Sequence, residues 1–129
     1  NRGLAISEAT ARADAAVEAV GLRGLADRAA AALSLGERKR AAIAAALARS
    51  PELLLLDEPT AELDGRAVRQ LASVLRALPV TRLITSHHLD FLRGLTTRTL
   101  VLVAGRIIAD GPTEVILSDQ LLLQEAGLV

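Results

Sequence analysis

Residues 53–60 read Leu-Leu-Leu-Leu-Asp-Glu-Pro-Thr, and they give the strongest local signal in the sequence. A short apolar run bounded by prolines predicts a strand that is buried on both faces, as in a parallel sheet. Two carboxylates, Asp57 and Glu58, follow at the strand end, where open parallel sheets bind their ligands. Such a pair is costly to bury unless it is used. Because neighbouring strand residues point in different directions, we expect separate roles for the two carboxylates. The plainer alternative is that they only begin a turn before Pro59.

The rest of the chain alternates between helix and strand around this run. Ser7 is expected to cap the first helix and Gly21 to end it. The alternation from Leu53 onward predicts an α/β fold with a mainly parallel sheet. The expected elements are helices at 8–20, 34–49, 66–77 and 89–95, strands at 53–56 and 81–86, a hairpin of strands 99–103 and 106–109, and short helices from Pro112.

Composition limits the kinds of partner. The chain has 129 residues, no cysteine, a single aromatic residue (Phe91), and 15 basic against 15 acidic groups. Zero net charge and almost no aromatic rings argue against a nucleic-acid partner. Without cysteine, disulfides and thiolate metal sites are excluded. No apolar run is long enough to span a membrane. A chain that begins at Asn1 and contains no methionine is expected to be a fragment or a processed protein.

A second signal lies at residues 33–37, Leu-Ser-Leu-Gly-Glu. Ser34 and Glu37 have the spacing of a capping box, which places a helix N-terminus here. Such a terminus offers unpaired backbone N–H groups and a partial positive charge, and both favour phosphate. Gly36 would let a ligand approach the backbone closely. The alternative is an ordinary capped helix.

A third signal is His87, which directly follows the predicted strand 81–86. A histidine at the end of a strand can donate a hydrogen bond to a phosphate oxygen or to water, although a lone histidine is more often structural. His88 beside it could suggest a zinc site. Adjacent residues at a strand end diverge and no third ligand is evident, so the sequence disfavours zinc.

In this order, the segments resemble the ATP-binding subunit of ATP-binding-cassette (ABC) transporters. Residues 86–91 and 121–128 are most similar to the energy-coupling-factor and cobalt/nickel importer branch. The matching segments are the signature motif at Leu33–Glu37, Walker B at Leu53–Asp57, the catalytic-glutamate position at Glu58, the D-loop at Ala61–Asp64, the switch histidine at His87, and the late hairpin within residues 98–112.

The resemblance implies a partial P-loop NTPase fold of the ABC ATPase type. Residues 1–50 would end the helical subdomain, and residues 51–129 would form the second part of the catalytic core. The implied activity is ATP hydrolysis with Mg²⁺, coupled to membrane transport, with cobalt/nickel or vitamin import as the implied cargo class. The implied partners are a second ABC ATPase subunit and transmembrane transporter subunits at the inner face of the cell membrane.

The resemblance also implies a role for each site residue. Asp57 would help bind Mg²⁺, Glu58 would act on the attacking water, and His87 would contact the γ-phosphate. The signature segment and the D-loop would face ATP held by the partner subunit. The residues placed there are Ser34, Leu35, Gly36, Glu37 and Asp64.

The sequence departs from the family pattern at several places. It contains no Gly-x-x-x-x-Gly-Lys-[Ser/Thr] loop, no recognisable Q-loop, and a single lysine, Lys39. Leu35 replaces the first signature glycine, Glu37 replaces the usual glutamine, and His88 stands where the family often has aspartate. A carboxylate at position 37 would repel ATP, although its capping role would partly offset this. We therefore expect the chain alone to be inactive and to fold poorly.

Two alternatives to a working ATPase remain. A degenerate ABC remnant could serve only as an interaction or dimerisation module, and the missing P-loop favours it. A soluble ABC protein of translation or DNA repair is the other. Single copies of each motif and the lack of a basic patch disfavour that second alternative.

Overall fold

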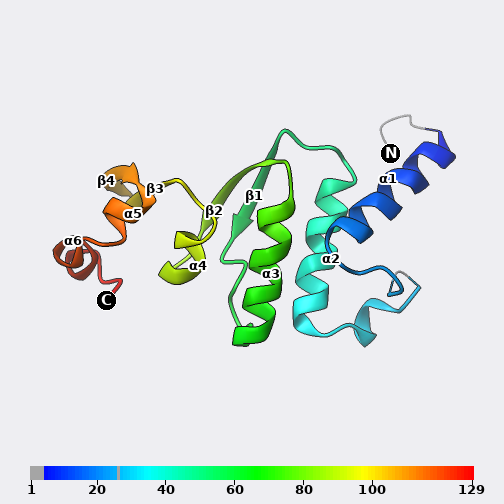
Figure 1. The fold of residues 1–129 in the computed structure, drawn as a ribbon, viewed down its shortest axis with the longest axis horizontal. Coiled ribbons are helices and arrows are strands. Elements are labelled where there is room, and N and C mark those ends of the chain that lie inside the picture. Colours follow the sequence, from blue (N-terminus) through cyan, green and yellow to red (C-terminus); the bar gives the residue numbers. More distant parts are fainter. Residues whose placement is uncertain (1–4, 26) are drawn as a thin grey trace. The chain divides into compact units, whose positions relative to one another are not determined.

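The computed structural model describes residues 5–25 and 27–129 (Figure 1). The chain divides into two compact units, Asn1–Thr85 (unit 1) and Ser86–Val129 (unit 2), and each is described by itself. Unit 1 contains α1 (Ile6–Ala19), η1 (Ala30–Ala32), α2 (Leu35–Leu47), β1 (Leu53–Asp57), α3 (Gly65–Ala77) and β2 (Thr81–Thr85). Unit 2 contains α4 (Leu89–Arg93), β3 (Arg98–Val103), β4 (Arg106–Pro112), α5 (Thr113–Ile116) and α6 (Gln120–Glu125).

The first helix begins earlier than the sequence predicts. Its N-cap is Ala5, which makes no side-chain cap, so Ser7 lies inside the helix and the predicted cap is wrong. The predicted end is confirmed, because Gly21 has φ +69° and its N–H donates to the carbonyl of Glu18 at 2.9 Å. Glycine adopts this left-handed conformation without a Cβ clash.

The parallel pairing expected from the apolar run is confirmed. β1 and β2 pair in parallel, with Leu53 opposite Thr81 and Asp57 opposite Thr85. Leu54 is buried, but Leu55 is 65% exposed and Leu83 beside it is 52% exposed. The expectation of a strand buried on both faces is therefore wrong for this chain. Within the described residues of unit 1, Leu54 is covered and Leu55 and Leu83 are left exposed, so only one face of the sheet is covered; Figure 1 shows α2 and α3 in the same unit as β1.

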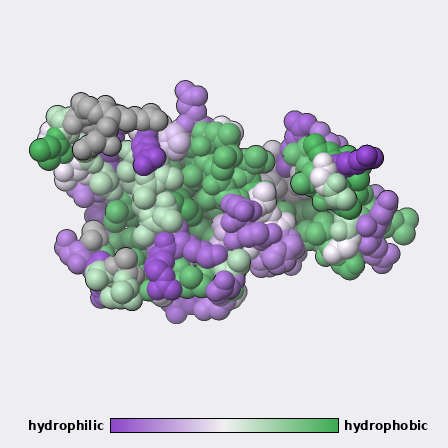
Figure 2. All heavy atoms as spheres, turned by 180° about the vertical axis from the view of Figure 1, so that it is seen from behind, coloured by the Kyte–Doolittle hydropathy of each residue, from purple (hydrophilic) through white to green (hydrophobic). Residues whose placement is uncertain are grey.

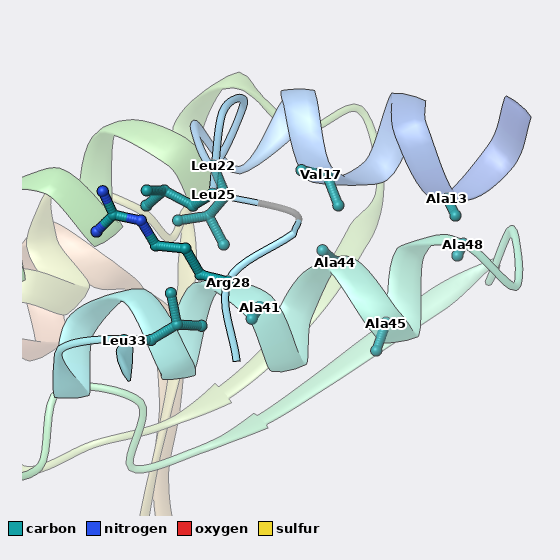
Figure 3. A pocket seen from close by; sticks show the side chains of 10 residues that line it. All are labelled: Ala13, Val17, Leu22, Leu25, Arg28, Leu33, Ala41, Ala44, Ala45 and Ala48. Carbon is teal, nitrogen blue, oxygen red and sulfur yellow. The ribbon is translucent and has the colours of Figure 1, made fainter. Parts of the chain in front are cut away.

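A hollow lies between α1 and α2 because the facing side chains are small. Figure 3 shows Ala13 and Val17 on α1 facing Ala44 on α2 and Ala48, which follows the last residue of α2. The hollow has a volume of about 300 Å³. Leu22 and Leu25, from the segment after α1, also line it.

Unit 2 is built on the predicted hairpin. β3 and β4 pair antiparallel across Ala104 and Gly105, with a bulge after Val101. Val101 is buried on one face, whereas Leu102 and Ile107 are 66% and 60% exposed on the other. Hydrophobic surface is visible on both units in Figure 2. Over the described residues, no helix is both long and apolar enough to cross a membrane.

Candidate functional site

Asp57 lies at the carboxyl end of β1 with an exposed side chain. The hydroxyl of Thr85, its partner on β2, donates a hydrogen bond to Asp57 Oδ1. That bond fixes one carboxylate oxygen while the group stays at the surface. The arrangement suits a carboxylate that must meet a ligand outside the sheet edge.

Glu58 turns away from the strand immediately after Asp57. Its φ of +42° lies in the left-handed region, and its side chain is half-buried. The backbone N–H of Glu58 donates to the Thr85 carbonyl at 3.0 Å and lies 3.2 Å from the Thr85 hydroxyl oxygen. The reversal ends β1 and gives the two carboxylates different surroundings, as expected from their adjacent positions.

The segment at residues 33–37 forms the predicted capped helix start. Ser34 Oγ accepts from the N–H of Glu37 at 3.3 Å, and Glu37 Oε2 accepts from the N–H of Ser34 at 2.7 Å. The backbone bond from Ser34, then its hydroxyl, and then the charges of Arg40 and Arg28 hold the pKa of Glu37 below its ordinary value. The capping interaction thus favours the ionised carboxylate of Glu37 at the helix N-terminus.

Asp64 is the N-cap of α3, and its Oδ1 accepts from the N–H of Ala67 at 2.8 Å. Residues 34–37 and 62–64 line one polar cavity of about 390 Å³. The structure thus brings together two sequence segments that are 25 residues or more apart. Sequence reasoning missed the polar residues that complete this cavity, and these are Arg40, Arg66 and Gln70.

His87 belongs to unit 2, in the segment between β2 and α4, and its side chain is exposed. The neighbouring His88 stacks on Phe91, with ring centroids 6.3 Å apart and planes inclined by 19°. The other predicted site residues lie in unit 1. The role of His87 toward phosphate therefore stays a prediction.

Comparisons with known proteins agree on one family. Residues 1–61 match the family model described as ABC transporter. A putative ABC transporter ATP-binding protein of Synechocystis is 43% identical over 99% of this chain and 45% of its own length. A Clostridium perfringens structure, described as a CbiO protein from the ABC transporter complex CbiONQ, superposes with a TM-score of 0.84 at 31% identity, covering 99% of this chain and 53% of that one. The chain belongs to the ABC transporter ATP-binding family.

Further members of the family support this placement. The cobalt import ATP-binding protein CbiO of Rhodobacter capsulatus is 40% identical over 99% of this chain and 47% of its own length. An ATP-binding cassette in an ADP conformation superposes with a TM-score of 0.81 at 30% identity, covering 91% of this chain and 49% of that one. The ABC chain spans about half the length of the curated relatives it matches.

ABC ATPases bind ATP with Mg²⁺, and the strand end of this ABC chain fits such a group. Mg²⁺ usually takes one or two carboxylates and completes its shell with phosphate oxygens and water. Asp57 offers an exposed carboxylate at this edge. The described residues contain no cluster of three or more histidine, aspartate or glutamate side chains that could cage a metal alone. A single carboxylate that shares the ion with nucleotide phosphates is consistent with this donor set.

Proposed function

We propose that this chain is the C-terminal portion of an ATP-hydrolysing ABC transporter subunit. The observation that carries the proposal is the divergence of Asp57 and Glu58 at the end of β1. Asp57 is exposed and held by the Thr85 hydroxyl, whereas Glu58 reverses into the left-handed region and is half-buried. Such a pair provides one metal-binding carboxylate and one separately oriented base.

In this proposal each residue has one task. The Mg²⁺ ion, when bound with ATP, neutralises charge on the transferring phosphate. Asp57 would hold that ion, and the hydrogen bond from the Thr85 hydroxyl orients the Asp57 carboxylate. Glu58 orients the attacking water and accepts its proton. His87 donates a hydrogen bond to the γ-phosphate, where charge develops during transfer.

The proposed partners are a second ATPase subunit and transmembrane transporter subunits at the inner face of the membrane. The signature segment at residues 33–37 and the turn at residues 61–64 would face the nucleotide of the second subunit. Their shared cavity supports that role. For cargo, we propose a metal ion or a vitamin taken up by an importer. Support comes from the Rhodobacter relative, which is described as a cobalt import protein.

A non-catalytic interaction module is the second candidate. It is favoured by the ionised Glu37, which occupies the helix N-terminus that would otherwise attract phosphate. Leu35 also places a side chain where the family usually has glycine. A chain of this kind would bind a second subunit without turning over ATP.

A chimeric protein tests the proposal. A Geobacter sulfurreducens relative is 46% identical over 99% of this chain and 51% of its own length. The part of that relative that precedes its matched region is fused in frame before Asn1. We expect Mg-ATP turnover by the chimera and none by the chain alone, because the preceding part is expected to carry the P-loop. Glu58→Gln should lower turnover roughly 10²–10⁴-fold while ATP binding persists.

The matched control is Glu52→Gln, which removes an exposed carboxylate just before β1 and should leave turnover unchanged. A Glu58→Gln chimera that hydrolyses ATP at the parent rate contradicts the catalytic proposal. A folded chimera that binds a second subunit but never hydrolyses ATP favours the interaction module.

A further inference from the structure

Lys39, the only lysine of the chain, reaches from α2 to a distant turn. Its Nζ donates a hydrogen bond of 2.6 Å to the backbone carbonyl of Ala61, 22 residues further along, and the contact is partly buried. Solvated surface lysines more often extend into water. A charged donor held on one carbonyl contributes more than an ordinary neutral hydrogen bond.

The turn that receives this bond is strained. Two local backbone hydrogen bonds form this turn. The N–H of Ala61 donates to the Glu58 carbonyl and the N–H of Leu63 donates to the Thr60 carbonyl, both at 3.1 Å. Glu58 and Glu62 both have positive φ, +42° and +62°. Residues other than glycine adopt the left-handed φ/ψ region only at a cost in free energy. Contacts with the surrounding structure must therefore hold the turn in place.

Two further contacts tie the same helix to α3. A Cβ added at Gly36 would lie 3.2 Å from Ala67 Cβ, so the two backbones approach closely. Arg40 Nη1 donates to Gln70 Oε1 at 3.3 Å. Lys39 lies between these two contacts in the sequence and binds the turn that leads into α3. The start of α2, the turn and α3 are thus connected at three points.

We propose that Lys39 is a positioning residue, whose ammonium group fixes the turn at residues 58–64 against α2. It thereby sets the relative placement of Glu58, at the start of the turn, and of Ser34, at the start of the helix. This inference rests on the proposed function, because those two residues are the ones assigned to water and to the partner's nucleotide. In this proposal Lys39 itself contacts neither substrate nor metal and acts through the turn.

Hydrogen exchange tests the positioning without requiring activity. The amides of Ala61 and Leu63 are followed in the nucleotide-free chimera, with the β1–β2 amides as an internal reference and the 129-residue chain as a second sample. In Lys39→Met we expect the two turn amides to exchange about 10-fold faster while the reference amides keep their rates. Lys39→Arg, which keeps the charge, should restore most of the protection.

Steady-state kinetics then test the consequence. Turnover is expressed per mole of bound nucleotide, so that unfolded protein does not contribute. Lys39→Met should lower kcat about 10-fold and change KM for ATP less than about twofold, because the phosphate cradle is expected in the part fused before Asn1. Lys39→Arg should recover kcat. Arg49→Met is the control, since it removes an exposed positive charge near the end of α2 and should leave kcat unchanged.

The outcomes separate this inference from the proposed function. Unchanged exchange at Ala61 and Leu63, or an equal increase at every amide, overturns the positioning role of Lys39. A parent chimera without ATP turnover overturns the proposed function, while the exchange result still decides the role of Lys39. A parent that turns over ATP and a Lys39→Met variant with the same kcat overturn this inference alone.

Discussion

Gly36 of α2 packs tightly against Ala67 of α3, because a Cβ on Gly36 would lie only 3.2 Å from Ala67 Cβ. The glycine is buried, and its role here is to provide room. Because position 36 has no side chain, α2 contacts α3, the helix that follows the turn at residues 58–64. The sequence predicts that this glycine lets a ligand approach, and that role stays a prediction. In the structure its missing side chain leaves room for a neighbouring helix.

Gly36→Ala is therefore expected to destabilise the chimera. Overpacking costs about 1–3 kcal/mol, which exceeds the gain of up to about 1 kcal/mol from replacing a helical glycine by alanine. In an Ala67→Gly background the clash disappears, so the same substitution should become stabilising. A double-mutant cycle in urea measures this coupling. Additive effects of the two substitutions would show that the close approach carries no energy.

Glu62 is a position where glycine should preserve or improve stability. Its φ of +62° costs an L residue about 1–2 kcal/mol, against about 0.5–1 kcal/mol for the extra chain entropy of glycine. Glu62→Gly should thus leave the free energy of unfolding equal or raise it by about 1 kcal/mol. Glu62→Ala removes the carboxylate but keeps the Cβ, and it should show no such gain. Equal stabilities of the glycine and alanine variants would refute the strain.

The lowered pKa of Glu37 predicts a pH dependence of stability. Its causes are the backbone and hydroxyl hydrogen bonds from Ser34, followed by the charges of Arg40 and Arg28. A carboxyl whose pKa is lower in the folded state stabilises fully above its unfolded pKa. That stability is lost as the pH falls through the folded value. Urea midpoints measured from about pH 6 down to pH 3 should decline more steeply in the parent than in Glu37→Gln. Parallel profiles would mean that the capping box does not contribute.

The hollow between α1 and α2 offers a stabilising substitution. Ala41 lines it, and a leucine there would bury apolar surface in the volume of about 300 Å³. Ala41→Leu should raise the free energy of unfolding by about 1 kcal/mol. Ala15→Leu, at an exposed position of α1, is the control and should stay near zero. Loss of stability in Ala41→Leu would show that the hollow collapses or is filled in solution.

The sequence predicted the fold well where local chemistry decides it. The Ser34–Glu37 capping box, the turn at Gly21 and the parallel strand before Asp57 follow from residues within a few positions of each other. The Ser7 cap failed because Ala5 already begins the helix, which leaves Ser7 within it. The order of the motifs likewise indicates the family from the sequence alone.

Long-range contacts of the candidate site could not be read from the sequence. Nothing near Lys39 indicates the Ala61 carbonyl as its partner, because that bond depends on how α2 packs beside the turn. The shared cavity of residues 34–37 and 62–64 has the same origin. The buried strand was overpredicted, because a continuous leucine run gives hydrophobicity but does not reveal whether a second layer is present.

The exposed face of the β1–β2 sheet predicts that a charged substitution benefits the chain alone and destabilises the chimera. Leu55 and Leu83 are 65% and 52% exposed side by side on β1 and β2, and Leu53 adds to the same apolar face at 48%. Parallel sheets are normally covered on both sides. The chain alone should therefore self-associate and bind the dye ANS, and Leu55→Lys should reduce both effects.

In the chimera the preceding half is expected to cover this face, so Leu55→Lys should there cost about 2 kcal/mol or more of stability. Glu52→Lys, at an exposed position before β1, is the control for charge in both samples. Size-exclusion chromatography, ANS fluorescence and urea unfolding provide the measurements. A Leu55→Lys chimera as stable as its parent would mean that nothing covers the face, and the proposal of a two-part ATPase domain would then lose its structural basis.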